Sequence, residues 1–156
     1  EKAIPDAVAM RARMLRDLPP DGPWDVKLGR GGLVEVEFIA QALQLVHART
    51  TPGVLVQTTR RVLAKLAEAG ALSAEEAAAP IAAQRLWLRL TVGPWREEAL
   101  PDSVAAALLN ACRSLGPDCA PVDLPALRAQ MAERAAAVRA IFERRLGRPE
   151  SQGDHA

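Results

Sequence analysis

The sequence predicts an all-α fold, an antiparallel bundle of five to six helices preceded by a short extended segment and a glycine-rich turn. Two observations carry this prediction. Alanine is unusually frequent, tyrosine is absent and aromatic residues make up only 3% of the chain, and alanine and leucine are strong helix formers but weak strand formers. Apolar residues also recur at helical spacing in segments that proline and glycine separate.

The length of 156 residues fits a single domain, and the 49% of hydrophobic residues suffices for a core. We expect one helical domain over residues 1–156, with a junction motif at residues 24–34 and a disordered polar tail at residues 148–156. The sequence starts at Glu1 with residues that already look helical. We therefore expect it to be a piece of a longer protein.

The charge pattern argues against a nucleic-acid partner, which would need a clustered basic face. Lysine and arginine number 20, aspartate and glutamate 19, and the net charge is +1. Most arginines have acidic neighbours, which predicts solvated helix faces. These dispersed residues are Arg11, Arg13, Arg16, Arg128, Arg134, Arg139, Arg144 and Arg145.

No apolar run is long enough to cross a bilayer, and no secretory signal is present. Cys112 and Cys119 lack the spacing of a zinc site or a disulfide framework. We expect a cytoplasmic protein with reduced thiols and no membrane partner.

The first predicted helix covers residues 4–18, where apolar residues recur at helical spacing with arginines between them. The prolines of residues 19–23 end it, because proline cannot donate to the helical hydrogen-bond ladder. Apolar and polar residues then alternate over residues 24–28, starting at Trp24 and Val26. This alternation predicts a short extended segment with one apolar face.

The other helix boundaries follow from turn and cap signals. Gly70 stands where a left-handed C-terminal cap is expected, with Leu72 placed for the accompanying hydrophobic contact. Ser73 and Glu76 form a capping box for the next helix. Pro80 lies inside that helix, so we expect a kink or a break into two shorter helices. The remaining helices are predicted at residues 35–48, 58–69, 81–92, 102–115 and 124–146.

The helix at residues 81–92 is expected to be the central, most buried one, because its apolar residues surround the axis. Gly93 and Pro94 end this helix. Trp24, Trp87, Trp95 and Cys112 are interpreted as core or core-edge residues. His47 has no convincing partner and is expected on a helix surface.

Residues 25–41, DVKLGRGGLVEVEFIAQ, carry the strongest functional signal, with three glycines in four positions directly before a helix. The turn of Gly29, Arg30, Gly31 and Gly32 could bring backbone close to a phosphate at the helix N-terminus. It lacks the Lys-Ser/Thr of a P-loop and the spacing of a dinucleotide fingerprint. A tight connection without a ligand is the simpler interpretation.

Polar residues follow this turn on the predicted helix. Glu35 and Glu37 are two positions apart and point in different directions, so a shared metal site is not expected. Carboxylates in a first helical turn are favoured by the helix dipole alone. Glu37, Gln41 and Gln44 share one helix face and could meet something outside the bundle, and Lys27 could point the same way.

Residues 27–33, KLGRGGL, followed by Glu35, Glu37 and Gln41 resemble the K-x-G-x-G-G-I-x-[DE]-I-E-F-x-x-Q signature of the glutamine synthetase adenylyltransferases. A related segment occurs in the uridylyltransferases that modify the PII-type nitrogen signal protein. In both families it follows a nucleotidyltransferase domain and opens a helical domain. Val34 replaces a common arginine, as in C-terminal copies. The resemblance therefore places the chain at the C-terminal end of the adenylylating half.

This resemblance implies an enzyme that transfers AMP from ATP to a tyrosine of glutamine synthetase in nitrogen regulation. The family's active site resembles others in which a Gly-Ser turn and a D-x-D pair hold two Mg²⁺ ions. The sequence contains neither motif. We therefore expect no catalytic or metal-binding residue here, ATP and Mg²⁺ on the preceding domain, and an inactive isolated piece. The active-site-adjacent or domain-junction motif would comprise Lys27, Gly29, Arg30, Gly31, Gly32, Glu35, Glu37 and Gln41.

A second hypothesis is a regulatory or docking bundle that only binds partners, such as the PII-type protein, glutamine or glutamine synthetase. The two hypotheses differ in whether residues 27–41 face an active site or merely start the fold. An unrelated α-helical scaffold would require the motif match to be chance.

Overall fold

The computed structural model describes residues 2–91 and 100–149, and in this part of the chain all regular structure is helical. The predicted all-α class is confirmed. Expectations for residues 92–99, including Gly93, Pro94 and Trp95, and for residues 150–156 lie outside the described residues. The helices are α1 Ala3–Asp17, α2 Leu33–His47, η1 Pro52–Val54, α3 Thr59–Glu68, α4 Ala74–Leu90, α5 Asp102–Arg113, η3 Pro117–Cys119 and α6 Leu124–Arg145.

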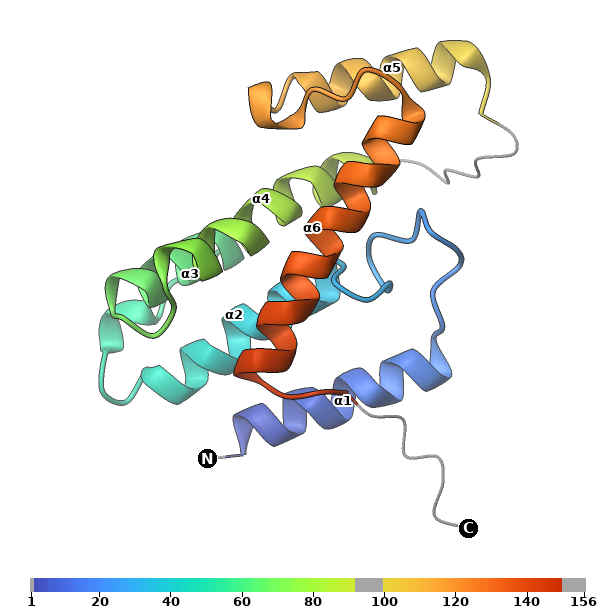
Figure 1. Ribbon diagram of the computed structural model, residues 1–156. Coiled ribbons are helices and arrows are strands. Elements are labelled where there is room, and N and C mark those ends of the chain that lie inside the picture. The colour runs from blue at the N-terminus through green and yellow to red at the C-terminus, as the bar shows by residue number, and fades with distance from the viewer. Residues whose placement is uncertain (1, 92–99, 150–156) are drawn as a thin grey trace.

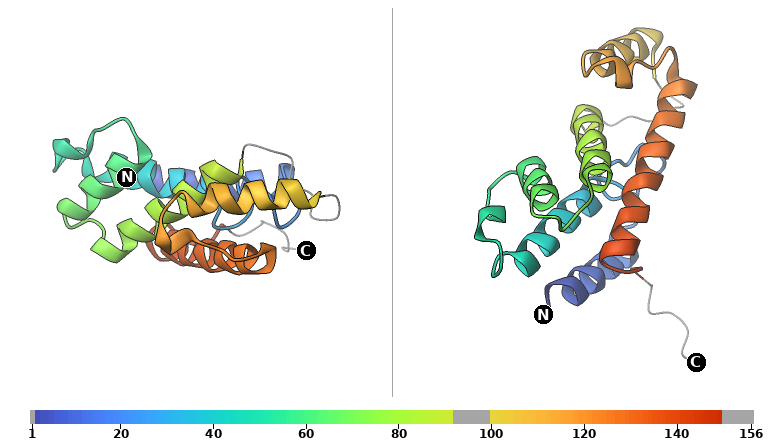
Figure 2. Two further views of the ribbon diagram at one scale, coloured as in Figure 1. Left: turned by 90° about the horizontal axis from the view of Figure 1, so that it is seen from above. Right: turned by 60° about the vertical axis from the view of Figure 1, so that its left-hand side comes forward.

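The helices α2 and α4 share the centre of the bundle. Helix α2 packs against α1, α3, α4 and α6, and α4 packs against α2, α3, α5 and α6. Figure 1 shows α6 crossing α4 and α2 diagonally, with α1 and α5 at opposite ends of the molecule. The same arrangement is seen in the side view of Figure 2. The segment between α1 and α2 therefore meets helices from the second half of the chain.

Local cap chemistry fixes the start of α4 as predicted. The Ser73 hydroxyl accepts from the Glu76 backbone N–H at 3.1 Å, and the Glu76 carboxylate accepts from the Ser73 N–H at 3.0 Å. Before it, Gly70 has a φ of 74°, and the buried Leu72 donates its backbone N–H to Leu66. These contacts join α3 to α4 through a tight, satisfied connection.

The expected break at Pro80 is wrong, because α4 runs as one helix from Ala74 to Leu90. Proline removes only its own N–H bond, which would have gone to the carbonyl of Glu76. Packing against α2, α3 and α6 holds the helix together across this gap.

The expected extended segment at residues 24–28 is also wrong, since the chain turns there. The Val26 N–H donates to Trp24 O at 2.9 Å, and the Gly29 N–H donates to Asp25 O at 3.0 Å. The Asp25 carboxylate accepts the backbone N–H groups of Lys27 and Leu28 at 3.2 and 2.9 Å. An aspartate that binds its own downstream backbone favours a turn over a strand.

The core is continuous, but α4 is not buried on every side. Leu86, Trp87 and Leu90 are each 1% exposed, whereas Leu88 is 52% exposed. The apolar residues around the α4 axis therefore overstate its burial, and α2 shares its central place. Helix α6 buries a stripe of Leu127, Met131, Val138 and Phe142. None of the described helices combines the length and apolar character that spanning a membrane requires.

Candidate functional site

The glycine-rich turn is built around the Glu35 carboxylate, which is completely buried at the start of α2. Its Oε1 accepts from Arg11 Nε at 3.0 Å and from Arg30 Nε at 2.7 Å. Its Oε2 accepts the Gly31 backbone N–H at 2.8 Å. The helix dipole alone does not account for Glu35, because a buried carboxylate needs these partners to offset its lost hydration.

Arg11 of α1 is the second buried member of this cluster, although the sequence pattern predicted a solvated arginine. Its side chain is 0% exposed, and its Nη2 donates to the carbonyls of Leu28 at 2.7 Å and Gly29 at 3.1 Å. One signal could have found it. Arg11 stands in register with the apolar positions Ile4, Val8 and Leu15, so it lies on the face of α1 that packs against α2.

Arg30 ties the turn to the last helix. Its Nη2 donates to Glu143 Oε1 of α6 at 2.9 Å, and the same oxygen accepts from Arg139 Nε at 3.1 Å. Hydrogen bonds from Arg139 and Arg30 hold the pKa of Glu143 below its ordinary value. One carboxylate on α2 and one on α6 thus bind the two ends of the Arg30 guanidinium.

The glycines allow the turn to approach other backbone closely. A Cβ on Gly31, which has a φ of 75°, would lie 2.0 Å from the carbonyl oxygen of Ala135 in α6. A Cβ on Gly32 would lie 2.6 Å from Val26 O. The Trp87 indole N–H donates to Gly31 O at 3.1 Å. Glycine at position 31 therefore serves the packing of the turn against α4 and α6, whereas glycine at position 32 lets the turn fold closely on itself.

The amides that a phosphate would need are already engaged. Gly31 N–H is bound by Glu35, and Gly32 N–H donates to Gly29 O at 2.9 Å. Leu33 and Val34 N–H groups donate to Val26 O and Lys27 O at 2.7 and 3.2 Å. The turn is a tight, internally satisfied connection, and a phosphate cradle at this helix N-terminus is contradicted.

The other predicted motif residues lie outside the buried cluster. The side chains of Lys27 and Gln41 are exposed and that of Glu37 is half-buried. Gln44 does not face outward with them. Its amide nitrogen donates to the carbonyls of Val54 at 2.8 Å and Val56 at 2.9 Å, and so holds the loop around η1.

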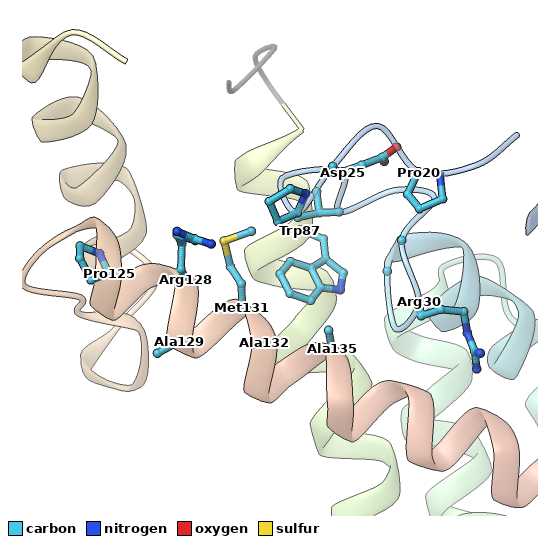
Figure 3. A pocket seen from close by; sticks show the side chains of 15 residues that line it. Pro20, Asp25, Arg30, Trp87, Pro125, Arg128, Ala129, Met131, Ala132 and Ala135 are labelled. Atoms are coloured by element: carbon cyan, nitrogen blue, oxygen red, sulfur yellow. The ribbon is translucent and has the colours of Figure 1, made fainter. Parts of the chain in front are cut away.

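An open cavity of about 520 Å³ lies beside the turn, between residues 20–32 and α6. Figure 3 shows Trp87 and Met131 at this cavity, while the Arg30 side chain extends away from it. Most lining side chains are apolar. The carboxylate of Asp25, which also lines it, is engaged by backbone N–H groups.

The remaining candidates do not assemble into a catalytic centre. Within residues 2–91 and 100–149, no group of three or more His, Cys, Asp or Glu side chains could hold a metal ion. His47 is half-buried in the last turn of α2. Cys112, Trp24 and Trp87 are buried as predicted. Burial raises the pKa of the Cys112 thiol to about 11.

Comparison with known proteins shows similarity over nearly the whole chain. Residues 9–145 match a family model described as GlnD PII-uridylyltransferase. The chain is 36% identical over 148 residues to a bifunctional glutamine synthetase adenylyltransferase/adenylyl-removing enzyme of Rhodopseudomonas palustris, which covers 91% of this chain and 14% of the relative.

Two relatives with the same name match a shorter part of the chain more closely. The enzyme of Caulobacter vibrioides is 49% identical over 83 residues, and that of Mycolicibacterium smegmatis is 43% identical over 79 residues. Each match covers 50% of this chain and 8% of the relative. No solved structure matches the chain.

Proposed function

The chain belongs to the family described as GlnD PII-uridylyltransferase, and we propose that it acts as a helical domain of a bifunctional glutamine synthetase adenylyltransferase. The observation that carries this proposal is the 36% identity to such an enzyme over 91% of the chain. The chain spans only 14% of that relative. Most of the enzyme's activity would accordingly reside in other domains.

In this proposal the full-length enzyme transfers AMP from ATP to a tyrosine of glutamine synthetase, and the chain lies at the C-terminal end of the adenylylating half. ATP and Mg²⁺ would bind the preceding nucleotidyltransferase domain. The sequence given holds no Gly-Ser turn and no D-x-D pair, which are the elements that position metal ions in related transferases. The isolated chain would then be inactive.

The contribution of the helical domain would be a rigid surface at the domain junction. The turn of residues 29–32 is fixed by Glu35, and Lys27 lies beside the first turn of α2 because its carbonyl accepts from Val34 N–H. The Lys27 side chain is exposed on this fixed backbone. An exposed cation on a fixed backbone suits contact with an acidic group or a phosphate on the adjoining domain.

The test uses the full-length enzyme and follows AMP incorporation into glutamine synthetase. Lys27→Ala should lower the rate by about ten-fold or more, with an unchanged melting curve, because an exposed side chain contributes little to stability. The matched control is Lys65→Ala, since Lys65 lies on α3 with a side chain that is 42% exposed and pairs with Glu68 three residues further along the same helix. This control should leave both rate and melting curve unchanged.

Three outcomes separate the hypotheses. If the unmutated enzyme fails to label glutamine synthetase, the proposed adenylyltransferase function falls. If Lys27→Ala keeps the full rate but loses its response to the PII-type protein or glutamine, the docking hypothesis takes its place. If Lys27→Ala lowers the rate only in proportion to a loss of folded enzyme, as read from the melting curve, the residue is structural and the junction assignment is wrong.

A further inference from the structure

We propose that Arg11 is the positioning residue of the glycine-rich turn, and that it acts through Leu28, Gly29 and Glu35 to hold the Lys27 surface in register. This inference rests on the proposed function for its catalytic consequence. Its structural part stands on the geometry of the buried cluster alone. Arg11 lies outside the motif that the sequence pattern singled out, on a different helix.

The geometry shows that one guanidinium holds both sides of the turn. The Nε of Arg11 binds the Glu35 carboxylate after the turn, and its Nη2 binds the carbonyls of Leu28 and Gly29 at the start of it. These acceptors are 17 to 24 residues away in sequence. A planar group with fixed donors can join three acceptors in this way, whereas the single ammonium of a lysine cannot match all of them.

The burial of Arg11 indicates a role beyond surface charge. Its side chain is 0% exposed, and its remaining nitrogen, Nη1, is buried with no partner among the described residues. Burying a guanidinium without satisfying all of its donors is costly. A chain needing only an apolar contact between α1 and α2 would be served as well by leucine or methionine. Arginine at this position also fixes the Glu35 carboxylate relative to the Leu28 and Gly29 carbonyls, because it binds all three.

The two arginines of the cluster have different tasks. Arg30 binds Glu35 from within the turn and connects it to Glu143 on α6, and its side chain is 27% exposed. Arg11 approaches Glu35 from α1, whereas the bond to Glu143 comes from Arg30. Removing Arg11 therefore releases the carbonyls of Leu28 and Gly29, next to Lys27, while Arg30 and Gly31 still hold Glu35.

The experiment measures hydrogen–deuterium exchange and AMP transfer in the full-length enzyme carrying Arg11→Met, which keeps length and apolar packing but removes the donors. Exchange should rise about ten-fold or more in peptides covering residues 26–34 and stay unchanged in α3. The turnover number should fall by about ten-fold or more at a temperature where the variant is folded, because small displacements at a catalytic interface are costly. The Michaelis constant for ATP should change little.

Two controls separate positioning from general destabilisation. Arg13→Met removes an exposed arginine two residues further along α1 and should change neither measurement. Leu66→Ala opens a cavity in the core at α3, remote in sequence from the turn, and lowers the melting temperature without touching the cluster. At equal folded fraction, Leu66→Ala should retain its turnover number. If it loses as much as Arg11→Met, the positioning role is overturned.

Arg11→Lys completes the series and substitutes for Arg11→Met if that variant does not fold. Lysine keeps the charge but can bind only part of the acceptor set, so both exchange and turnover should lie between those of the arginine and methionine enzymes. Uniform exchange changes across all helices, or a turnover number unaffected in both variants, would contradict the proposal. The exchange result does not depend on enzyme activity, so it decides the structural role even if the adenylyltransferase function fails.

Discussion

At the residue scale, the turn depends on a glycine position that has no room for a Cβ atom. Gly31 combines a φ of 75° with a closest approach to the Ala135 carbonyl that no Cβ could share. The surrounding backbone belongs to α6, which packs against α4 and α2 and would lose those contacts if it moved away. Glycine at position 31 is thus required by the tertiary fold as much as by the turn itself.

A glycine-to-alanine series separates the strain of a positive φ from the steric clash of an added Cβ. Gly31→Ala should destabilise the protein by more than about 3 kcal/mol, since it combines strain with a backbone clash. Gly70→Ala, with a φ of 74° and open space around it, should cost only about 1 kcal/mol. Gly53→Ala meets neither obstacle and should be close to neutral. Urea unfolding of the three variants measures these differences, and equal costs for Gly31 and Gly70 would rule out the clash.

At the element scale, ionic and apolar contacts between helices take over from local propensity. Glu76 belongs to the capping box of α4 but also binds Arg144 and Arg145 at the end of α6. The hydrogen bonds from Arg145, the Ser73 backbone N–H and Arg144 lower the pKa of Glu76 from 4.5 to about 2, with Arg145 as the largest cause. One carboxylate thereby joins the start of α4 to the C-terminal end of α6.

The Glu76 linkage predicts a defined pH dependence. Because its pKa is lower in the folded protein, the ionised carboxylate stabilises the fold above about pH 4.5, and this contribution is lost as the pH falls toward 2. Glu76→Gln should cost on the order of 1–2 kcal/mol at pH 7, since solvent reaches the two arginines and weakens the pairs. The difference from the unmutated protein should shrink as the pH falls.

Chemical unfolding at several pH values measures that difference. The matched control is Glu68→Gln on α3, an exposed carboxylate paired with Lys65, which should have little effect at any pH. A Glu76→Gln cost that stayed constant from pH 7 to 3 would show that the charge of Glu76 is not what stabilises the fold.

The thiols of α5 and η3 provide a second prediction at this scale. Cys112 and Cys119 are buried and are not in a disulfide, and burial raises the pKa of Cys112 to about 11. At pH 8 its thiolate fraction, and with it the alkylation rate, should be about 100-fold below that of an ordinary thiol. Peptide mass spectrometry after iodoacetamide treatment would measure this protection. Labelling as fast in buffer as in urea would contradict the buried placement.

At the scale of the whole molecule, the helices differ in how many buried residues they contribute to the core. Helix α2 contributes seven buried residues and packs against four other α-helices, whereas α5 contributes Leu108 and Cys112 and, among the described elements, packs mainly against α4, α6 and η3. Elements with few buried contacts open first in native proteins. We therefore expect the end of the molecule that carries α5, visible in Figure 1, to open before α2.

Hydrogen exchange of the native protein tests this order. Amides of α5 should exchange well before those of α2, with opening free energies lower by several kcal/mol. Helix α3, buried through Val62, Leu63 and Leu66, is the matched reference because it is short like α5 but better packed. Equal protection of α5 and α2 would show that the bundle opens as a single unit.

The sequence by itself determined the helical class, most helix boundaries, the Ser73 capping box and the left-handed Gly70. These features depend on residues within a few positions of one another, so local propensity and cap chemistry suffice. The motif in residues 27–41 was likewise visible as a string of residues, and it led to the family that the comparisons show.

Only the tertiary structure decided which conformation the motif adopts and which of its side chains are buried. The alternation of Trp24 and Val26 suggested a strand, but Asp25 closes a turn there. Glu35 read as an ordinary first-turn carboxylate and Arg11 as a solvated arginine, yet they form a buried pair 24 residues apart. The register of Arg11 with Ile4 and Val8 marks the packed face of α1, but which group meets Arg11 across the core is a long-range pairing that no local pattern encodes.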